Sequence, residues 1–271
     1  DGVQHLLFQR RVHCAAAADA AALKKLRDDA SREPRLGALL SAQLLRDGAV
    51  SDGVAEVLGA VTALDPALGE AMRADGDDKA RVSAVAALSG KAKEAGTLML
   101  LAQEGAKLGF LEQAALIAQR CSSAADLTSR SRAPLVRESV LGDRLGDARA
   151  VYRSASQPGA VARLGSLRRL EAVLGSARRA ALPDLVEDVC VLMWDISLPL
   201  LQPDLLPSLR SLEAASFALE EADSLRYELR ASLHLELARA ASIADNSRHA
   251  AQHIAKGLSL DLPLGRASCE A

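Results

Sequence analysis

Two histidines one helical turn apart, His249 and His253, have the spacing that comes closest to a chemical site. Residues four apart in a helix project from the same face, so these two imidazoles are spaced to share a transition-metal ion. Asp245 is the only obvious third ligand, and no cysteine lies nearby. A half-exposed helix face without a metal is the simpler interpretation, so we expect no metal and no cofactor.

A third histidine, His234, lies between Leu233 and Leu235 in an apolar segment. An imidazole in such a place is a candidate general base, but a base needs a nucleophile or a substrate group within hydrogen-bond reach. No nucleophile accompanies His234 in the sequence. We therefore expect a packed histidine whose ring is satisfied by a neighbour.

The short motifs that indicate phosphate, dinucleotide, zinc-protease or hydrolase chemistry do not occur in the sequence. The acidic cluster Asp75, Asp77 and Asp78 lacks the alternating oxygen ligands and the closing Glu of a calcium loop, so we expect it to cap the helix that follows. The residues thus predict that the chain is not an enzyme.

A basic run opposed only by Glu171 lies between Gly159 and Pro183; its members are Arg163, Arg168, Arg169, Arg178 and Arg179. The two arginine pairs are about three helical turns apart and are expected near one face. The simpler interpretation is a solvated helix face. The alternative is a surface that docks an acidic partner, such as a tubulin tail or an acidic helix of a neighbouring scaffold protein.

The only tryptophan, Trp194, stands in the run WDISLPLLQ at residues 194–202. Tryptophan is enriched at binding hot spots, yet the neighbours of Trp194 make this helix apolar nearly all round, as in a helix covered on both sides. We therefore interpret Trp194, Leu198 and Pro199 as core residues. Pro199 is expected to kink or end the helix.

Composition favours an all-α fold. The chain is 49% hydrophobic but only 2% aromatic, so its core is built from Ala, Leu and Val, and the strand-favouring residues are scarce. The formal net charge of -2, with both signs interspersed, gives no overall field for nucleic acid or an anionic membrane, and we expect neither as a partner. The four separated cysteines and the absence of a leader or a spanning segment predict a soluble intracellular protein.

Proline, glycine and Asp/Asn turns divide the chain into helices without long linkers. We expect helices at about 3–29, 36–46, 51–64, 79–108 with a break near Gly90, 111–127, 133–153, 159–181, 183–202, 204–222, 224–242 and 247–259. Residues 1–79 are interpreted as N-terminal helical hairpins that continue into an α-solenoid at 80–271.

A common register supports the solenoid. Offsets of the tetratricopeptide pattern, counted from Ser41, Leu101 and Leu237, place small residues at two helix crossings: Ala42, Ala102 and Ala238 at one, and Val54, Ala114 and Ala250 at the other. The last hairpin is expected to bury Leu233, Leu237, Ala238 and Ile254. Most aromatic positions of the pattern are missing, so we expect irregular tetratricopeptide-like repeats of antiparallel helical hairpins.

Four stretches together resemble the N-terminal part of the cilia- and flagella-associated protein 46 family, a helical-repeat family of the ciliary central apparatus. They are the Trp194 run and its continuation in Asp223-Ser224-Leu225 with Leu229-Arg230, then residues 234–238 and residues 258–261. The resemblance is clearest from about Arg169 to Asp261 and fainter back to Lys91. The family tends to carry a basic, proline-free stretch where this chain has Pro203-Asp204-Leu205-Leu206-Pro207, so a basic contact there is not expected.

The resemblance implies a scaffold in a projection of a central-pair microtubule, where such proteins help to regulate dynein-driven motility. It implies localisation to the axoneme, other projection proteins and calmodulin as partners, and no catalytic residue. The first residue is Asp1, and a helix is expected almost at once, so we also expect a piece of a longer polypeptide. The alternative function is a cytosolic tetratricopeptide-type adaptor that binds a peptide segment of a partner protein.

Overall fold

The computed structural model describes residues 33–47, 50, 52–74, 77–92, 94–145, 158–201 and 209–260, and in these ranges every regular element is a helix. The predicted all-α class is therefore confirmed for them. The helices are α3 (Pro34–Arg46), α4 (Gly53–Leu64), α5 (Pro66–Arg73), α6 (Asp78–Ala87), α7 (Ala95–Lys107), α8 (Leu111–Cys121), α9 (Leu127–Leu145), α10 (Pro158–Arg179), α11 (Pro183–Ser197), the 3-10 helix η1 (Leu198–Leu200), α12 (Leu209–Glu221), α13 (Tyr227–Ile243) and α14 (Ser247–Ser259). The helix expected at 3–29 lies outside the described residues.

Polar caps begin several helices where the sequence places a turn. Asp52, Asp65 and Asn246 each accept a backbone N–H of the first turn that follows, and Asp77 does so from Ala80 at 2.9 Å. The expected capping role of the acidic cluster is thus confirmed for Asp77. These contacts satisfy amide groups that have no partner inside the helix.

One expected helix break is confirmed, whereas two helices differ from the sequence-based expectation: α5, and α9, which begins at Leu127 and not near residue 133. The segment 79–108 forms two helices, α6 and α7, and Gly90 between them has a φ of +82°, which a residue with a side chain rarely adopts. The expected break near Gly90 is thus confirmed. Helix α5 was not predicted, although Asp65 caps it and Pro66 occupies its first turn, which are both signals of a helix start.

The chain divides into two compact units, residues 1–140 and residues 141–271, and the division falls within α9. The boundary suggested by the sequence, between residues 79 and 80, falls instead inside α6 of the first unit. Unit 1 and unit 2 are described separately below.

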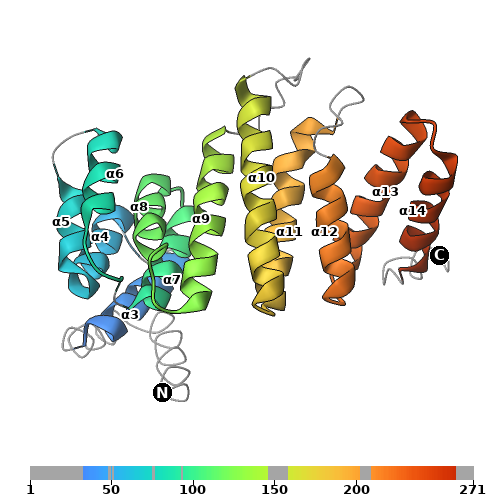
Figure 1. Cartoon of the computed structure of the whole chain (residues 1–271). Coiled ribbons are helices and arrows are strands. Elements are labelled where there is room, and N and C mark those ends of the chain that lie inside the picture. The colour runs from blue at the N-terminus through green and yellow to red at the C-terminus, as the bar shows by residue number, and fades with distance from the viewer. Residues whose placement is uncertain are drawn as a thin grey trace. The chain divides into compact units, whose positions relative to one another are not determined.

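Unit 1 is built from two hairpins in contact and a helix pair between them in sequence. The hairpin α3–α4 packs against the hairpin α7–α8, whereas α5 and α6 pack on α4 and α8 (Figure 1). The small residues of the predicted register are buried at these crossings, with Ala42 5%, Ala102 0% and Ala114 1% exposed. The two segments that share the register are therefore spatial neighbours.

A buried ion pair fixes the inserted helices of unit 1. Arg120 on α8 donates from Nε to Asp65 Oδ2 at 3.1 Å, and its Nη1 reaches the carbonyls of Leu88 and Gly90. Asp65 also caps α5, so one guanidinium joins α8 to the start of α5 and to the loop after α6. Both side chains are less than a tenth exposed.

Unit 2 is a row of neighbouring helices. Consecutive helices from α10 to α14 pack on one another, and α10 also contacts α12 (Figure 1). In the terminal hairpin Leu233, Leu237 and Ala238 are buried, as predicted, and Ala250 faces them from α14. The α-helix α11 ends at Ser197 and continues as η1, so Pro199 ends the α-helix, again as predicted.

Four core assignments need correction, and the first is Pro199, which is only half-buried in η1. Leu198 is 48% exposed because it opens the 3-10 turn, which rotates it away from the buried side of α11. Ile254 is 51% exposed because α14 turns a different face toward α13. Trp194 is only half-buried, and Met193 beside it, at 0% exposed, occupies the centre that the sequence assigned to the tryptophan.

Candidate functional site

The exposed side of α10 is the strongest candidate for a partner-binding surface. Its buried side is a stripe of Leu167, Leu170, Leu174 and Ala177, which packs within unit 2. Arg168, Arg169, Arg178 and Arg179 are exposed and are called here the arginine face. Four guanidinium groups on one helix produce a local positive potential even though the chain is nearly neutral.

Arg163 does not belong to this face, and its prediction as a partner-binding residue is wrong. It is 3% exposed. The physical reason is its helical position, because Arg163 lies one turn before Leu167 and two turns before Leu170, on the buried stripe.

A short repeat in the sequence of α10 positions two of the exposed arginines. Residues 164–169 read LGSLRR and residues 174–179 read LGSARR. Arg169 and Arg179 each donate from Nη2 to the serine hydroxyl three residues earlier, Ser166 and Ser176, at 3.2 Å in both cases. The glycine before each serine leaves the helix surface bare, and the guanidinium lies close to it. Sequence reasoning missed this repeat, although its spacing of ten was visible.

Arg178 is shared with α12. Its Nε donates to Glu221 at 2.6 Å, and its guanidinium lies 5.0 Å from the centroid of the Phe217 ring, a cation–π distance. Arg178 is therefore partly neutralised within unit 2. The other members of the arginine face, Arg168, Arg169 and Arg179, are exposed and can be exchanged without breaking this contact to α12.

The histidines of the terminal hairpin form a hydrogen-bonded relay. His234 Nε2 lies 3.1 Å from Glu220 Oε1, and His234 Nδ1 lies 3.0 Å from His253 Nδ1. His253 Nε2 then lies 3.3 Å from His249 Nε2. Glu220 also pairs with Lys256 at 2.9 Å. The relay joins α12, α13 and α14, and it confirms the expectation of a packed His234 satisfied by a neighbour.

The carboxylate sets the direction of this relay. Glu220 only accepts, so His234 donates from Nε2 and, when neutral, accepts at Nδ1 from His253. His253 in turn accepts at Nε2 from His249. Neutral rings therefore satisfy every contact, whereas two neighbouring protonated rings would place N–H against N–H. The relay is most favourable when its histidines are uncharged.

Burial and nearby cations also favour the neutral histidines, because both lower the pKa values of His234 and His253. Burial lowers the pKa of His234 below the ordinary 6.5; the Glu220 carboxylate raises it, while His253, Lys256 and Arg230 lower it further. Burial also lowers the pKa of His253, helped by His249 and Lys256 and opposed by Glu213 and Glu220.

Asp245 does not join the relay, and within the described ranges no group of three or more His, Cys, Asp or Glu side chains is placed to hold a metal ion.

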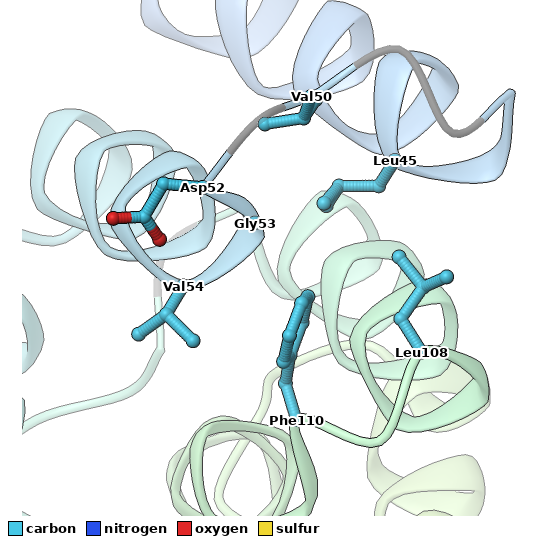
Figure 2. A pocket seen from close by; sticks show the side chains of 7 residues that line it. All are labelled: Leu45, Val50, Asp52, Gly53, Val54, Leu108 and Phe110. Carbon is cyan, nitrogen blue, oxygen red and sulfur yellow. The ribbon is translucent and has the colours of Figure 1, made fainter.

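An open pocket of about 500 Å³ lies in unit 1 where α3 and α4 meet the turn between α7 and α8. It is lined by Leu45, Val50, Asp52, Gly53, Val54, Leu108 and Phe110. Figure 2 shows the Phe110 ring pointing into the space between Gly53 and Leu45. A Cβ at Gly53 would overlap that ring, so the glycine is what lets the ring lie against the start of α4. The side chains that line the pocket are apolar except for Asp52.

The two cysteines among the described residues, Cys121 and Cys190, are both buried. Burial raises the pKa of the Cys121 thiol, on α8, and of the Cys190 thiol, on α11, to about 12 in each case, so neither is a thiolate nucleophile at neutral pH.

In the ranges that the structure covers, no helix combines the length and the apolar character needed to cross a membrane. No known protein-family model matches the chain.

Proposed function

We propose that the chain is a structural interaction module, an α-solenoid of irregular tetratricopeptide-like hairpins that holds neighbouring proteins in a projection of the ciliary central apparatus. The observation that carries the interaction role is the arginine face, a basic surface on a helix whose other side is committed to packing. Helical rows of this kind expose long surfaces for partners.

The packing of unit 2 supports the solenoid part of the proposal. Each helix there contacts its neighbours in sequence, which is the arrangement of stacked repeats. In unit 1 the hairpins α3–α4 and α7–α8 also contact each other, with α5 and α6 as an insertion. Buried Ala42, Ala102 and Ala238 at equivalent positions support a common repeat register.

The ciliary part of the proposal is supported by the resemblance of the Trp194 run and the terminal hairpin to the cilia- and flagella-associated protein 46 family. On this basis the partners are other projection proteins, with calmodulin and tubulin as further candidates. The arginine face suits acidic partners, among which tubulin tails carry dense negative charge. The role is that of a scaffold that contributes to the regulation of dynein-driven motility.

The experiment reverses charge on the arginine face. The triple variant Arg168→Glu, Arg169→Glu and Arg179→Glu leaves Arg178 in its contact with Glu221. The matched control is Arg130→Glu with Arg137→Glu, two exposed arginines of α9. Tagged proteins are expressed in ciliated cells, and the fraction retained on detergent-extracted axonemes at physiological salt is measured. We expect the wild type and the control to be retained and the triple variant to be lost; equal retention of all three would refute the role of this face.

A second candidate function, a cytosolic adaptor that binds a peptide segment, is favoured by the open pocket of unit 1. A partner's apolar side chain beside a basic residue would suit the Phe110 ring and the Asp52 carboxylate. Fractionation separates the two functions. An axonemal scaffold stays with extracted axonemes, whereas an adaptor is recovered in the cytosol and loses its peptide when Leu108→Glu places a charge at an exposed position of the pocket wall.

A further inference from the structure

The last described helix, α14, turns its polar side inward. His253 is 9% exposed and points to His234, and Gly257 lies so near α13 that a Cβ there would be 3.6 Å from the Cβ of His234. Together with Ala250, these residues form the side that packs on α13. The inner contact of α14 is therefore made by histidines and small residues.

Its outer side carries the apolar residues. Ala251, Ile254, Ala255 and Leu258 are all exposed, with Ile254 at 51% and Leu258 at 81%. Counted from Ala251 they stand at positions i, i+3, i+4 and i+7 of a single helical stripe, the pattern by which an amphipathic helix is recognised by another helix. A helix that hides histidines and presents leucine and isoleucine to water is unfavourable unless something covers it.

The other exposed large apolar residues of unit 2 do not form such a stripe, because no two of them lie three or four residues apart on one described helix; they are Val161, Leu198, Phe217, Leu225, Leu235 and Ile243. Phe217 is 57% exposed but lies beneath the guanidinium of Arg178. Val161 is 55% exposed, and its helical neighbours Arg168 and Gly165 offer no further apolar contact. Isolated exposures of this kind are ordinary on protein surfaces. The outer side of α14 differs because its apolar residues are contiguous.

The shape of the stripe indicates what covers it. Ala251 and Ala255 are one turn apart and allow the backbone of an incoming helix to approach closely, while Ile254 and Leu258 supply side chains that fit into its grooves. Helices in contact this way lie about 8–10 Å apart. The stripe is thus suited to a helix rather than to an extended strand or a small molecule.

The charged residues of α14 distinguish between two possible partner helices, a second copy of α14 and an acidic helix of another protein. Residues 247–259 contain Arg248 and Lys256 but no Asp or Glu. Arg248 lies at one edge of the apolar stripe, whereas Lys256 lies on the other side of α14, where it pairs with Glu220. A second copy of α14 would bring only like charges to the contact. A helix with acidic residues beside its apolar stripe would instead be attracted.

We infer that the outer face of α14, formed by Arg248, Ala251, Ile254, Ala255 and Leu258, docks an amphipathic helix of a partner protein whose apolar stripe is flanked by Asp and Glu. This inference deepens the proposed scaffold role and rests on it. It adds a second contact surface, distinct in chemistry from the arginine face. The arginine face attracts by charge, whereas this face binds by burial of a hydrophobic stripe and uses charge for selection.

The test uses the full chain and a defined probe. The probe is a capped, fluorescein-labelled helical peptide with Leu and Ile at spacings of three and four and Glu at the flanking positions; a second peptide has Lys in place of every Glu. Fluorescence anisotropy measures the dissociation constant at physiological salt. We expect the Glu peptide to bind at least about tenfold more tightly than the Lys peptide, a difference of about 1.4 kcal/mol.

Variants locate the binding. The double variant Ile254→Glu and Leu258→Glu is expected to weaken binding of the Glu peptide at least about tenfold, because it both removes apolar contact and adds like charge. Val161→Glu changes an equally exposed apolar residue on α10 and should bind as the wild type does. Arg248→Glu should reduce the preference for the Glu peptide. Circular dichroism spectra that match the wild type establish that each variant is folded.

Several outcomes would overturn the inference. They are an absence of binding to the full chain, equal binding of the two peptides, and unchanged binding by the Ile254→Glu, Leu258→Glu variant. Sedimentation that shows wild-type dimers dissociated by the same double variant would assign the face to a second copy. Normal axonemal retention combined with any of these results would reject the docking helix and leave the proposed scaffold role intact, whereas loss of wild-type retention would reject the role itself.

Discussion

The two units join their helices by different polar centres. In unit 1 Arg120 and Asp65 form a buried ion pair that also fixes the carbonyls of Leu88 and Gly90. In unit 2 a chain of hydrogen bonds through three histidines joins α14 to Glu220 on α12. The contacts of the first centre depend on the charges of Arg120 and Asp65, whereas the hydrogen bonds of the second are best satisfied when the histidine rings are neutral. The units therefore differ in what would break them.

Acidity should affect unit 2 first. In unit 1 the side chains of Arg120 and Asp65 are both buried in their ion pair. Elsewhere in unit 1, burial favours the protonated form of Glu104, but its hydrogen bonds to Arg46 and Lys107 outweigh burial and hold its pKa below the ordinary value. In unit 2, burial lowers the pKa values of His234 and His253, so both rings favour the neutral form. A shared helical architecture can thus contain one half that tolerates mild acid and one that responds to it.

The largest expected effect comes from cutting the ion pair of unit 1. Arg120→Leu leaves the Asp65 carboxylate buried without its cation, and the free energy of unfolding should fall by about 3–5 kcal/mol. Urea unfolding followed by circular dichroism measures the loss. The control is Arg178→Leu, which removes a pair that is half in solvent and should cost less than about 1 kcal/mol. Similar losses for the two variants would show that Arg120 is not the centre of unit 1.

Overpacking tests whether the two units share one hairpin geometry. Ala102→Leu in unit 1 and Ala238→Leu in unit 2 each place a larger side chain at a buried crossing, and each should lower the free energy of unfolding by about 1–3 kcal/mol. Ala251→Leu, on an exposed position of α14, should be close to neutral. Cooperative melting that is unchanged in Ala238→Leu would argue against a common register.

The histidine relay predicts a pH dependence confined to unit 2. Because the folded pKa values of His234 and His253 are lowered, the unfolded chain binds more protons below the ordinary value of 6.5. Stability should be full above that value and should fall as the pH drops through it toward the lower folded values. Urea unfolding followed by the fluorescence of Trp194, the only tryptophan, reports on unit 2.

The control for this prediction is His253→Gln, which interrupts the relay and removes one titrating ring. Its stability at pH 7.5 should be somewhat lower than that of the wild type, but its dependence on pH between 7.5 and 5.5 should be flatter. A slope equal to that of the wild type would mean that other groups cause the acid sensitivity.

The smallest effect should be the same in both units. Gly59 in α4 and Gly175 in α10 have helical backbones, and a Cβ would meet nothing within 4 Å at Gly59 and only Arg179 Nη1, at 3.5 Å, at Gly175. Gly59→Ala and Gly175→Ala should each raise the free energy of unfolding by about 0.5–1 kcal/mol. Thermal melts measure the gain, and a loss at either site would show a backbone requirement that the local geometry does not explain.

The helices themselves were largely predictable because their signals are local. Asp52, Asp65, Asp77 and Asn246 are caps that can be read from the sequence, and only α5 was missed among the described helices. The crossings marked by Ala102 and Ala238 were also found, since small residues at fixed offsets have a direct steric meaning.

The faces of the helices were harder to predict, because a face is defined by its neighbours. Arg163 was assigned to the surface and Ile254 to the core by composition, yet each helix turns the opposite way. The relay from His249 to Glu220 depends on contacts between three helices, and no pattern within one helix indicates it. The folded-back pairs Arg169–Ser166 and Arg179–Ser176 were local and could have been found from the repeat in α10.

The two buried cysteines provide separate reporters for the two units. Cys121 lies in unit 1 and Cys190 in unit 2, and both thiols are shielded in the folded chain. An alkylating reagent can reach either sulfur only when its own unit opens, so peptide mass spectrometry of the labelled chain would time the two openings separately. Labelling in mild acid would then show directly whether one half of the protein loosens while the other stays closed.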